Sequence, residues 1–212
     1  MVRFSEAGEA DQNLSPEEQR EERLLLWYFA IATIPGAIAG KLLEHSAEDY
    51  FREHIYLIAT ALIVVALLMW WAEKVSRMTK PLTRITFTDA LVVGCAQATA
   101  LIPGVSRSGS TITAGLFRDM TREAAVRFSF LLSTPIIAGA ALLKAHELRK
   151  EGLPAGMHAP FLVGVLVSAI VGYVTIAWLI RYLQSNSLKV FIVYRIVVGV
   201  IVIGLALMWH LQ

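Results

Sequence analysis

The sequence predicts an all-α, polytopic integral membrane protein. Of its 212 residues, 56% are hydrophobic and only 17% are charged, whereas soluble domains carry about 25% charged residues. The apolar residues fall in long blocks, several of which reach the roughly 20 residues that an α-helix needs to cross a bilayer. We therefore expect about five transmembrane helices and one re-entrant helix–loop–helix hairpin, rather than one compact soluble core.

Charge and cysteine content narrow the class further. A formal charge of +2 is too small to indicate nucleic-acid binding. A single cysteine, Cys95, excludes an internal disulfide framework. Residues 1–23 are polar and mostly acidic, unlike a signal peptide, which is basic and then apolar. We expect residues 1–23 to form a polar cytoplasmic lead-in and residues 24–212 to form a single transmembrane domain.

Five apolar segments predict the membrane-spanning helices, and the first three carry additional signals. The first holds Pro35-Gly36 near its middle, which favours a kink or a close approach to a neighbouring helix. The second ends on Trp70 and Trp71, whose indoles favour the membrane interface. The third contains Pro135. In chain order, the expected spans cover residues 24–43, 55–72, 124–143, 161–180 and 190–209.

Residues 87–117 differ from these spans and predict the re-entrant hairpin. Their first apolar run is too short to cross a bilayer, and Thr88 or Asp89 can cap its start. Pro103-Gly104 ends this arm, and a second, shorter arm follows. An apolar bilayer tolerates such irregular backbone only where protein or a water-filled cavity surrounds it, so the turn is expected to be a functional site.

Basic residues predict the orientation. With residues 1–23 in the cytoplasm, twelve lysines and arginines fall in inner loops and five fall in outer loops, which fits the positive-inside rule. That balance holds only if residues 87–117 enter and leave the membrane on the same side. The charge distribution therefore supports the re-entrant hairpin independently of its turn.

The turn of the hairpin carries groups suited to an oxyanion. Gly104 and Gly109 permit backbone conformations that direct successive N–H groups inward as an anion-binding nest. The start of the second arm offers free N–H groups and the positive end of a helix dipole. Arg107 supplies a planar fork that can bind phosphate oxygens bidentately. Neutral hydroxyl donors lie nearby at Ser106, Ser108, Ser110 and Thr111. This chemistry indicates a phosphate or a carboxylate bound inside a membrane.

Structural interpretations of the same residues stay open. Ser108 or Ser110 could simply cap the second arm. Arg107 could bind helix carbonyls rather than a ligand, although a cation at this depth favours a ligand. Gln97 could contact the substrate or form an interhelical hydrogen bond. The pattern is not a Walker loop, because it lacks the Gly-Lys-Ser/Thr ending.

The remaining polar residues supply little further chemistry. Cys95 with Gly94 is best explained as a small pair that permits close packing. Arg195, in the last span, could join the site or snorkel to the inner interface. All five histidines fall in loops or at span ends, and no Asp or Glu lies in the middle of a span. The sequence thus predicts a phosphate clamp without a base or metal ligands.

These motifs resemble the bacterial undecaprenyl-diphosphate phosphatases, the bacitracin-resistance family. The resemblance covers essentially everything from about residue 24 onward. Its strongest part is the second signature of the family, and weaker matches lie on both sides. The matching segments are Gly94-Cys95-Ala96-Gln97, Leu101-Ile102-Pro103-Gly104-Val105-Ser106-Arg107-Ser108-Gly109, Phe128-Ser129-Phe130-Leu131-Leu132 with Pro135, Thr33-Ile34-Pro35-Gly36, and Tyr194-Arg195.

The resemblance implies two inverted repeats, each with a re-entrant hairpin, whose tips meet in a cavity open to the periplasm of a bacterial inner membrane. Arg107 would hold the diphosphate as a catalytic residue, with Ser106 and Ser108 beside it. A divalent cation, Mg²⁺ or Ca²⁺, is implied, with ligands on the first hairpin rather than in this sequence. A homodimer is left open. The substrate-binding residues would be Gly104, Gly109, Ser110, Thr111 and Gln97.

The sequence departs from the family pattern in one respect. It contains neither the Glu-x-x-x-Glu motif nor the Ser-Ser-Thr-Gly-His segment of the first hairpin. We expect either a start codon upstream of Met1, or a fragment, in preference to a shortened copy. The expected function is hydrolysis of undecaprenyl diphosphate, a polyprenyl lipid, to undecaprenyl phosphate and phosphate. The alternatives are a lipid-phosphate flippase and an inactive remnant that binds lipid phosphate or a partner subunit.

Overall fold

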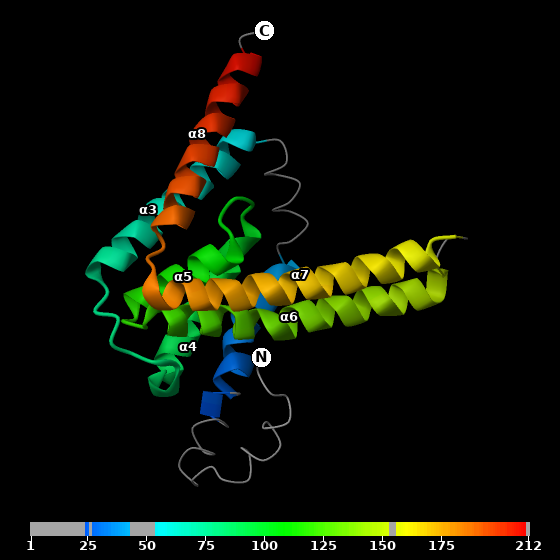
Figure 1. The fold of residues 1–212 in the computed structure, drawn as a ribbon, viewed down its shortest axis with the longest axis horizontal. Helices are drawn as coiled ribbons and strands as arrows, with labels where there is room; N and C mark the ends of the chain where they lie inside the picture. The colour runs from blue at the N-terminus through cyan, green and yellow to red at the C-terminus, as the bar shows by residue number, and fades with distance from the viewer. Residues whose placement is uncertain (1–23, 26, 43–53, 153–155, 211–212) are drawn as a thin grey trace.

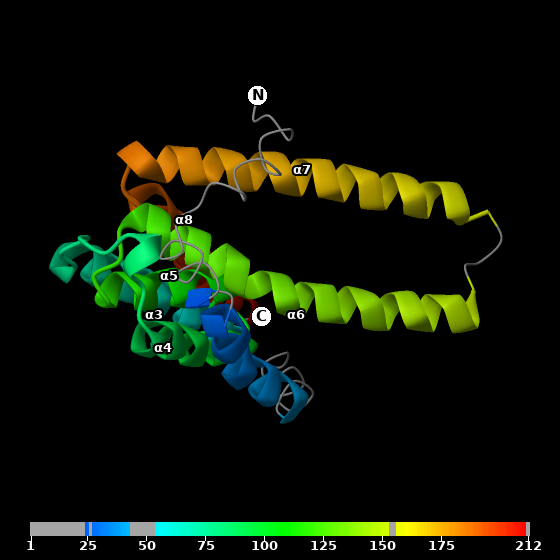
Figure 2. The ribbon, with the colours of Figure 1, turned by 90° about the horizontal axis from the view of Figure 1, so that it is seen from below.

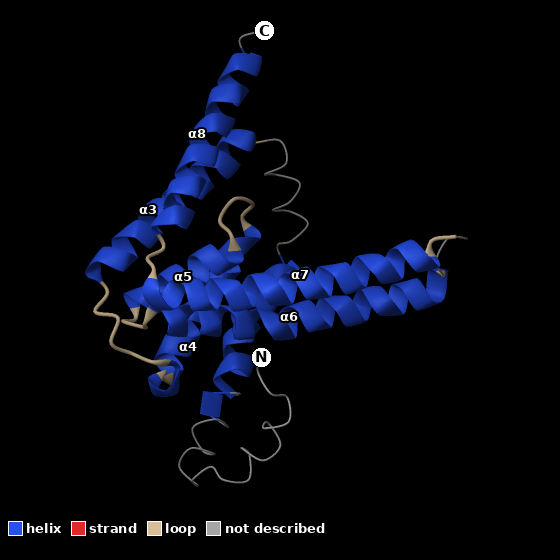
Figure 3. Ribbon diagram, viewed as in Figure 1, coloured by secondary structure: helices blue, strands red, loops and turns tan. Residues whose placement is uncertain are grey.

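The computed structural model describes residues 24–25, 27–42, 54–152 and 156–210, and this part of the chain is helical (Figure 1, Figure 3). No β-sheet forms among these residues; one isolated bridge joins Lys80 to Met120. Four helices in the described ranges are long and apolar enough to cross a membrane. They are α3 (Ile55–Val75), α6 (Arg122–Glu151), α7 (His158–Ser185) and α8 (Lys189–His210). The prediction of an all-α polytopic membrane protein is confirmed.

Each of these four helices extends beyond its predicted span, because polar residues continue the helix past the apolar block. α6 shows this most clearly. It begins after Thr121, whose hydroxyl accepts a hydrogen bond from the Ala124 amide, and it ends before Gly152, which has a φ of 75°. Arg149 and Lys150 in its last turn suit the negative end of the helix dipole. The length of the apolar block therefore gives the span but not the helix ends.

The long helices form two antiparallel pairs that diverge from a common region (Figure 1). α3 and α8 lie side by side. Gly199 of α8 lies so close to α3 that a Cβ atom there would be 3.1 Å from the carbonyl oxygen of Ala59. α6 and α7 extend away as the second pair (Figure 2). Leu183 is the one buried residue of α7, so its apolar side chains are free to face lipid.

Between α3 and α6, the chain forms the predicted helix–turn–helix. Its first arm starts at residue 87 and its second arm ends at residue 117, as the sequence predicts. The two arms pack against each other, and the second arm also packs on α3 and α6. Re-entry from one side of a membrane stays a prediction. The elements are a short 3₁₀ helix (Leu82–Arg84), α4 (Phe87–Ala98), a 3₁₀ turn (Thr99–Leu101) and α5 (Arg107–Phe117).

The first arm starts with a reciprocal capping box. The hydroxyl of Thr86 accepts a hydrogen bond from the Asp89 amide at 3.3 Å, and the Asp89 carboxylate accepts one from the Thr86 amide at 3.0 Å. The expectation of a cap at Thr88 or Asp89 is therefore wrong in position. The helix begins earlier because Thr86 and Asp89 satisfy each other's backbone donors.

The first predicted span is helical at residues 24–25 and 27–42, whereas residues 26 and 43 lie outside the described residues. This helix crosses α4 at Gly94. A Cβ atom at Gly94 would lie 2.3 Å from the carbonyl oxygen of Ala32. Close packing through Gly94 is thus confirmed, but Cys95 is exposed and takes no such part.

Replacing Gly94 by valine is expected to destabilise the protein by about 3 kcal/mol, at the upper end of overpacking costs. The clash is with backbone, which cannot rotate away. Thermal unfolding of the purified chain in detergent measures the effect. Gly164→Val is the matched control, because no atom lies within 4 Å of a Cβ atom placed there. An unchanged Tm for Gly94→Val would contradict the close contact.

Candidate functional site

The hairpin turn is held by a buried arginine from α8. Arg195 is 7% exposed, and its Nη2 donates to the carbonyl oxygens of Gly104 at 3.0 Å and Val105 at 2.8 Å. Its Nε donates to the carbonyl oxygen of Leu62 on α3 at 3.5 Å. Arg195 therefore does not snorkel to the interface. It ties the turn to α3 and α8, the carbonyl-binding role that was an alternative for Arg107.

The two predicted nest glycines have different reasons to be glycine. Gly104 has a φ of 93°, and a Cβ atom there would lie 2.3 Å from the carbonyl oxygen of Ile58. Gly109 has no positive φ; instead, a Cβ atom would lie 2.6 Å from Nη1 of Arg195. The second left-handed residue of the turn is Ser106, with a φ of 66°. Gly109 therefore does not supply the nest conformation expected of it, since it lies inside α5.

Ser106 caps the second arm. Its Oγ accepts a hydrogen bond from the Gly109 amide at 3.3 Å. Arg107 is consequently the first residue of α5, and the first-turn amides of this helix lack intrahelical acceptors. Neither Ser108 nor Ser110 is the cap, because both lie within the helix.

Arg107 lies in a pocket of about 420 Å³, here named the Arg107 pocket. Arg107 is half-buried, and no carboxylate of the described residues forms an ion pair with it. Small and apolar residues make up most of the wall. The lining residues are Gly36, Gly40, Gln97, Ala100, Leu101, Arg107 and Ile136.

Gln97 is an unpartnered buried amide in the same pocket. Its side chain is 3% exposed, and neither Nε2 nor Oε1 has a hydrogen-bond partner among the described residues. It lies against Gly36, where a Cβ atom would be 2.9 Å from Nε2. The interhelical hydrogen bond considered for Gln97 is thus not formed. Since a buried amide without a partner is costly, its place beside Arg107 points to a ligand in this pocket.

The structure does not bring all the predicted site residues together. Ser106, Ser108 and Gly109 line a second pocket and not the Arg107 pocket. Successive residues of a helix point about 100° apart, so Arg107 diverges from the serines on either side of it. A single clamp that includes Arg107 and both serines therefore stays a prediction.

Ser110 and Thr111 use their hydroxyls within the protein. The Oγ of Ser110 donates to the carbonyl oxygens of Ser106 and Arg107, each at 3.2 Å. Thr111 is fully buried, and its hydroxyl is 2.6 Å from that of Ser129 on α6. Neither residue lines the two pockets at the turn. Their contacts hold α5 together and fix it on α6, and substrate binding by them stays a prediction.

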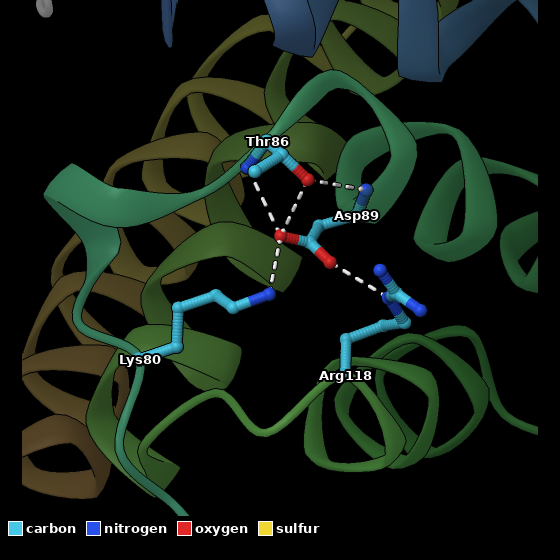
Figure 4. A network of polar contacts seen from close by, with 4 residues as sticks. All are labelled: Lys80, Thr86, Asp89 and Arg118. Carbon is cyan, nitrogen blue, oxygen red and sulfur yellow. Dashed lines mark hydrogen bonds and ion pairs between the residues drawn. The ribbon is translucent and has the colours of Figure 1, made fainter.

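A buried ion network holds the other end of the hairpin (Figure 4). Asp89 is fully buried, and its carboxylate accepts from Lys80 Nζ at 2.8 Å and from Arg118 Nε at 2.7 Å. Thr86 donates to it through its amide and its hydroxyl. Burial alone would raise the pKa of Asp89, but these hydrogen bonds lower it to about 2. The network joins the start of α4 to the end of α5.

A second ion pair extends this end of the structure. Arg122 Nε lies 2.6 Å from Glu73 Oε1, which also accepts from the Leu188 amide at 3.0 Å. Glu73 therefore links α3, α6 and the connection between α7 and α8. The role of Asp89 as the centre of this network is not among the sequence predictions, although a single acidic residue at the start of an apolar arm, between Lys80 and Arg118, is a signal for it. We call Glu73, Lys80, Asp89, Arg118 and Arg122 the hairpin base.

The divalent cation implied by the resemblance does not fit the described residues. No three His, Cys, Asp or Glu side chains converge within the part of the chain that the structure describes. The carboxylates of the hairpin base, those of Asp89 and Glu73, already form ion pairs with lysine and arginine side chains.

Comparison with known proteins gives the family. The model of the family described as "Bacitracin resistance protein BacA" matches residues 3–201. The protein named "Undecaprenyl-diphosphatase" of Trichlorobacter lovleyi is 47% identical over 190 residues, which are 90% of this chain and 70% of that protein. The protein of the same name from Moorella thermoacetica is 45% identical over 188 residues, 89% of this chain and 70% of the relative. That of Geobacter sulfurreducens is 50% identical over 173 residues, 81% and 64% of the two chains. With its hairpin, its turn motif and these matches, the chain belongs to the bacitracin resistance protein BacA family.

Proposed function

We propose that this protein hydrolyses undecaprenyl diphosphate to undecaprenyl phosphate and inorganic phosphate, the activity for which its relatives are named. One observation carries the proposal. Arg107, without an ion-pair partner among the described residues, shares a pocket with the unpartnered buried amide of Gln97. A cation and an unsatisfied amide in an apolar wall fit a ligand with several anionic oxygens.

Arg107 would stabilise the charge that develops on the transferred phosphoryl group. Its guanidinium fork matches two phosphate oxygens. Its position as the first residue of α5 adds the positive end of the helix dipole. Such fixed donors act where charge grows in the transition state. This arrangement supports phosphoryl chemistry rather than simple structural use of the arginine.

Gln97 would complete the contacts to the diphosphate. Its Nε2 can donate to a phosphate oxygen, and its Oε1 can accept from a water molecule beside it. Since both atoms lack protein partners among the described residues, a bound ligand would satisfy them. The small residues Gly36, Gly40 and Ala100 in the wall leave room for the headgroup. The prenyl chain would remain in the surrounding hydrocarbon.

The acid–base group and the ligands of a Mg²⁺ or Ca²⁺ ion belong, in this proposal, to residues outside the described part of the chain. The hairpin of this chain would bind the diphosphate, and a second hairpin would supply the attacking chemistry. We further propose a bacterial inner-membrane location with the Arg107 pocket opening toward the periplasm. The cationic residues of the hairpin base support this orientation, because cytoplasmic ends are rich in lysine and arginine.

The test compares binding with turnover. Binding of undecaprenyl diphosphate in non-ionic detergent and release of phosphate are measured for this chain. The same measurements are made on Arg107→Met. We expect this change to weaken both lipid binding and phosphate release. Lipid binding that is insensitive to Arg107→Met would overturn the clamp.

A further inference from the structure

The end of α3 lies in a region whose positive charge the protein neutralises only in part. Residues 73–89 and 117–127 meet there, and they hold seven lysines and arginines against four acidic residues, an excess of three positive charges. Four of these cations pair with acidic side chains of the same two segments. The three that form no ion pair within the described part of the chain are Lys74, Arg77 and Arg84.

Two of the unpaired cations, Lys74 and Arg77, lie close together at this end, and both are exposed. Lys74 is in the last turn of α3, and Arg77 follows the helix. The acidic residues linked to this stretch have other partners. Glu73 pairs with Arg122, and Asp119 Oδ1 accepts from the backbone amide of Arg77 at 2.8 Å. The ammonium of Lys74 and the guanidinium of Arg77 therefore remain available to an anionic group.

Exposed aromatic rings lie beside these cations. Trp70 and Trp71 are 50% and 53% exposed, and Lys74 Nζ lies 5.9 Å from the ring centroid of Trp70. Trp71 stands edge to face against Phe117 of α5, with ring centroids 5.2 Å apart. Indoles favour the depth of the lipid headgroups, so Trp70 places Lys74 at that depth. We call Trp70, Trp71, Lys74, Arg77 and Phe117 the α3-end surface.

The chemistry of the α3-end surface favours an anionic phospholipid. A phosphodiester at headgroup depth can reach the two cations, while its acyl chains extend along the rings. A zwitterionic headgroup brings its own cation and gains less from unpaired positive charge. An acidic protein segment would match the charge but would leave the rings unused. The surface shares no residue with the Arg107 pocket, and Phe117 ends α5, which Arg107 begins.

We propose that the α3-end surface binds an anionic phospholipid of the surrounding membrane. The phosphodiester oxygens would accept from Lys74 Nζ and from the guanidinium of Arg77. The acyl chains would lie against Trp70, Trp71 and Phe117. This site goes beyond the proposed hydrolysis, because the bound phospholipid is not the substrate and its binding requires neither turnover nor Arg107.

Quenching of tryptophan fluorescence by brominated lipids tests the proposal. The chain holds five tryptophans. In a reporter chain, Trp27→Phe, Trp178→Phe and Trp209→Phe leave Trp70 and Trp71 as the emitters. The reporter chain is placed in phosphatidylcholine vesicles that contain dibrominated phosphatidylglycerol or, for comparison, dibrominated phosphatidylcholine at the same fraction. We expect phosphatidylglycerol to bind about tenfold more tightly or better. Equal quenching by the two lipids would overturn the site.

Arg84→Gln is the matched control. Arg84 is also an exposed cation without an ion pair among the described residues, but it belongs to the 3₁₀ helix Leu82–Arg84, which packs on α6. Lys74→Gln and Arg77→Gln are each expected to lower the preference for phosphatidylglycerol about fivefold, whereas Arg84→Gln should change it less than twofold. Equal losses in all three variants would indicate general surface charge and contradict the site. Binding of a polyglutamate peptide that Lys74→Gln abolishes, without any lipid preference, would assign the surface to an acidic protein and overturn the proposal.

Discussion

Replacing Arg107 by methionine is expected to lower the rate of undecaprenyl diphosphate hydrolysis by about 10³-fold or more. Among the described residues that line the Arg107 pocket, Arg107 is the one charged side chain, and the change removes it. Methionine has a similar length and is apolar, so it should leave the half-buried position filled. Lysine keeps the charge but loses the planar fork, so Arg107→Lys is expected to cost about 10²-fold. Release of phosphate from undecaprenyl diphosphate measures both effects.

The control for these variants is Arg127→Lys. Arg127 is 48% exposed and pairs with Glu123 one turn away on α6, so its replacement should leave the rate within a factor of two. Gln97→Leu tests the contribution of the amide separately, because it removes the unpartnered amide without changing the charge of the Arg107 pocket. A rate for Arg107→Met close to that of Arg127→Lys would show that Arg107 does not act on the phosphate.

The sequence was a good guide to the helices and the hairpin. Four predicted spans appear as α3, α6, α7 and α8, because bilayer thickness sets the length of an apolar block. The two arms of the hairpin lie where predicted, because Pro103-Gly104 separates them and the first apolar run is too short to cross a bilayer. These features depend on neighbouring residues, and so they can be inferred from a local stretch of sequence.

The arrangement of the site could not be inferred in the same way. The left-handed backbone of Ser106 and the start of α5 at Arg107 decide which side chains share a pocket, and no local pattern fixes them. Arg195 reaches the turn from α8, 90 residues further along the chain. Its role depends on how α3, α8 and the hairpin pack, which is a property of the whole fold.

The second large effect is expected at Asp89. Replacing Asp89 by leucine leaves Lys80 and Arg118 without their counter-charge at the hairpin base. Breaking a buried ion pair by removing one partner costs about 3–5 kcal/mol. Because the side chains of Lys80 and Arg118 are 24% and 38% exposed, we expect the lower end, about 3 kcal/mol. Thermal unfolding in detergent measures it. Glu147→Gln, which breaks an exposed ion pair with Lys144, should change stability by no more than about 0.5 kcal/mol.

The pH dependence of stability separates the charge of Asp89 from its shape. Its folded pKa of about 2 lies below the ordinary value of 3.8. The ionised carboxylate therefore contributes stability that is fully present above about pH 4 and is lost as the pH falls through 2. The contribution is on the order of 2 kcal/mol. We expect the stability difference between the native chain and Asp89→Asn to be constant from pH 7 to about pH 4 and to shrink toward pH 2. A difference that stays constant down to pH 2 would show that packing, not charge, explains the effect of Asp89, since the protonated native side chain and asparagine are both neutral there.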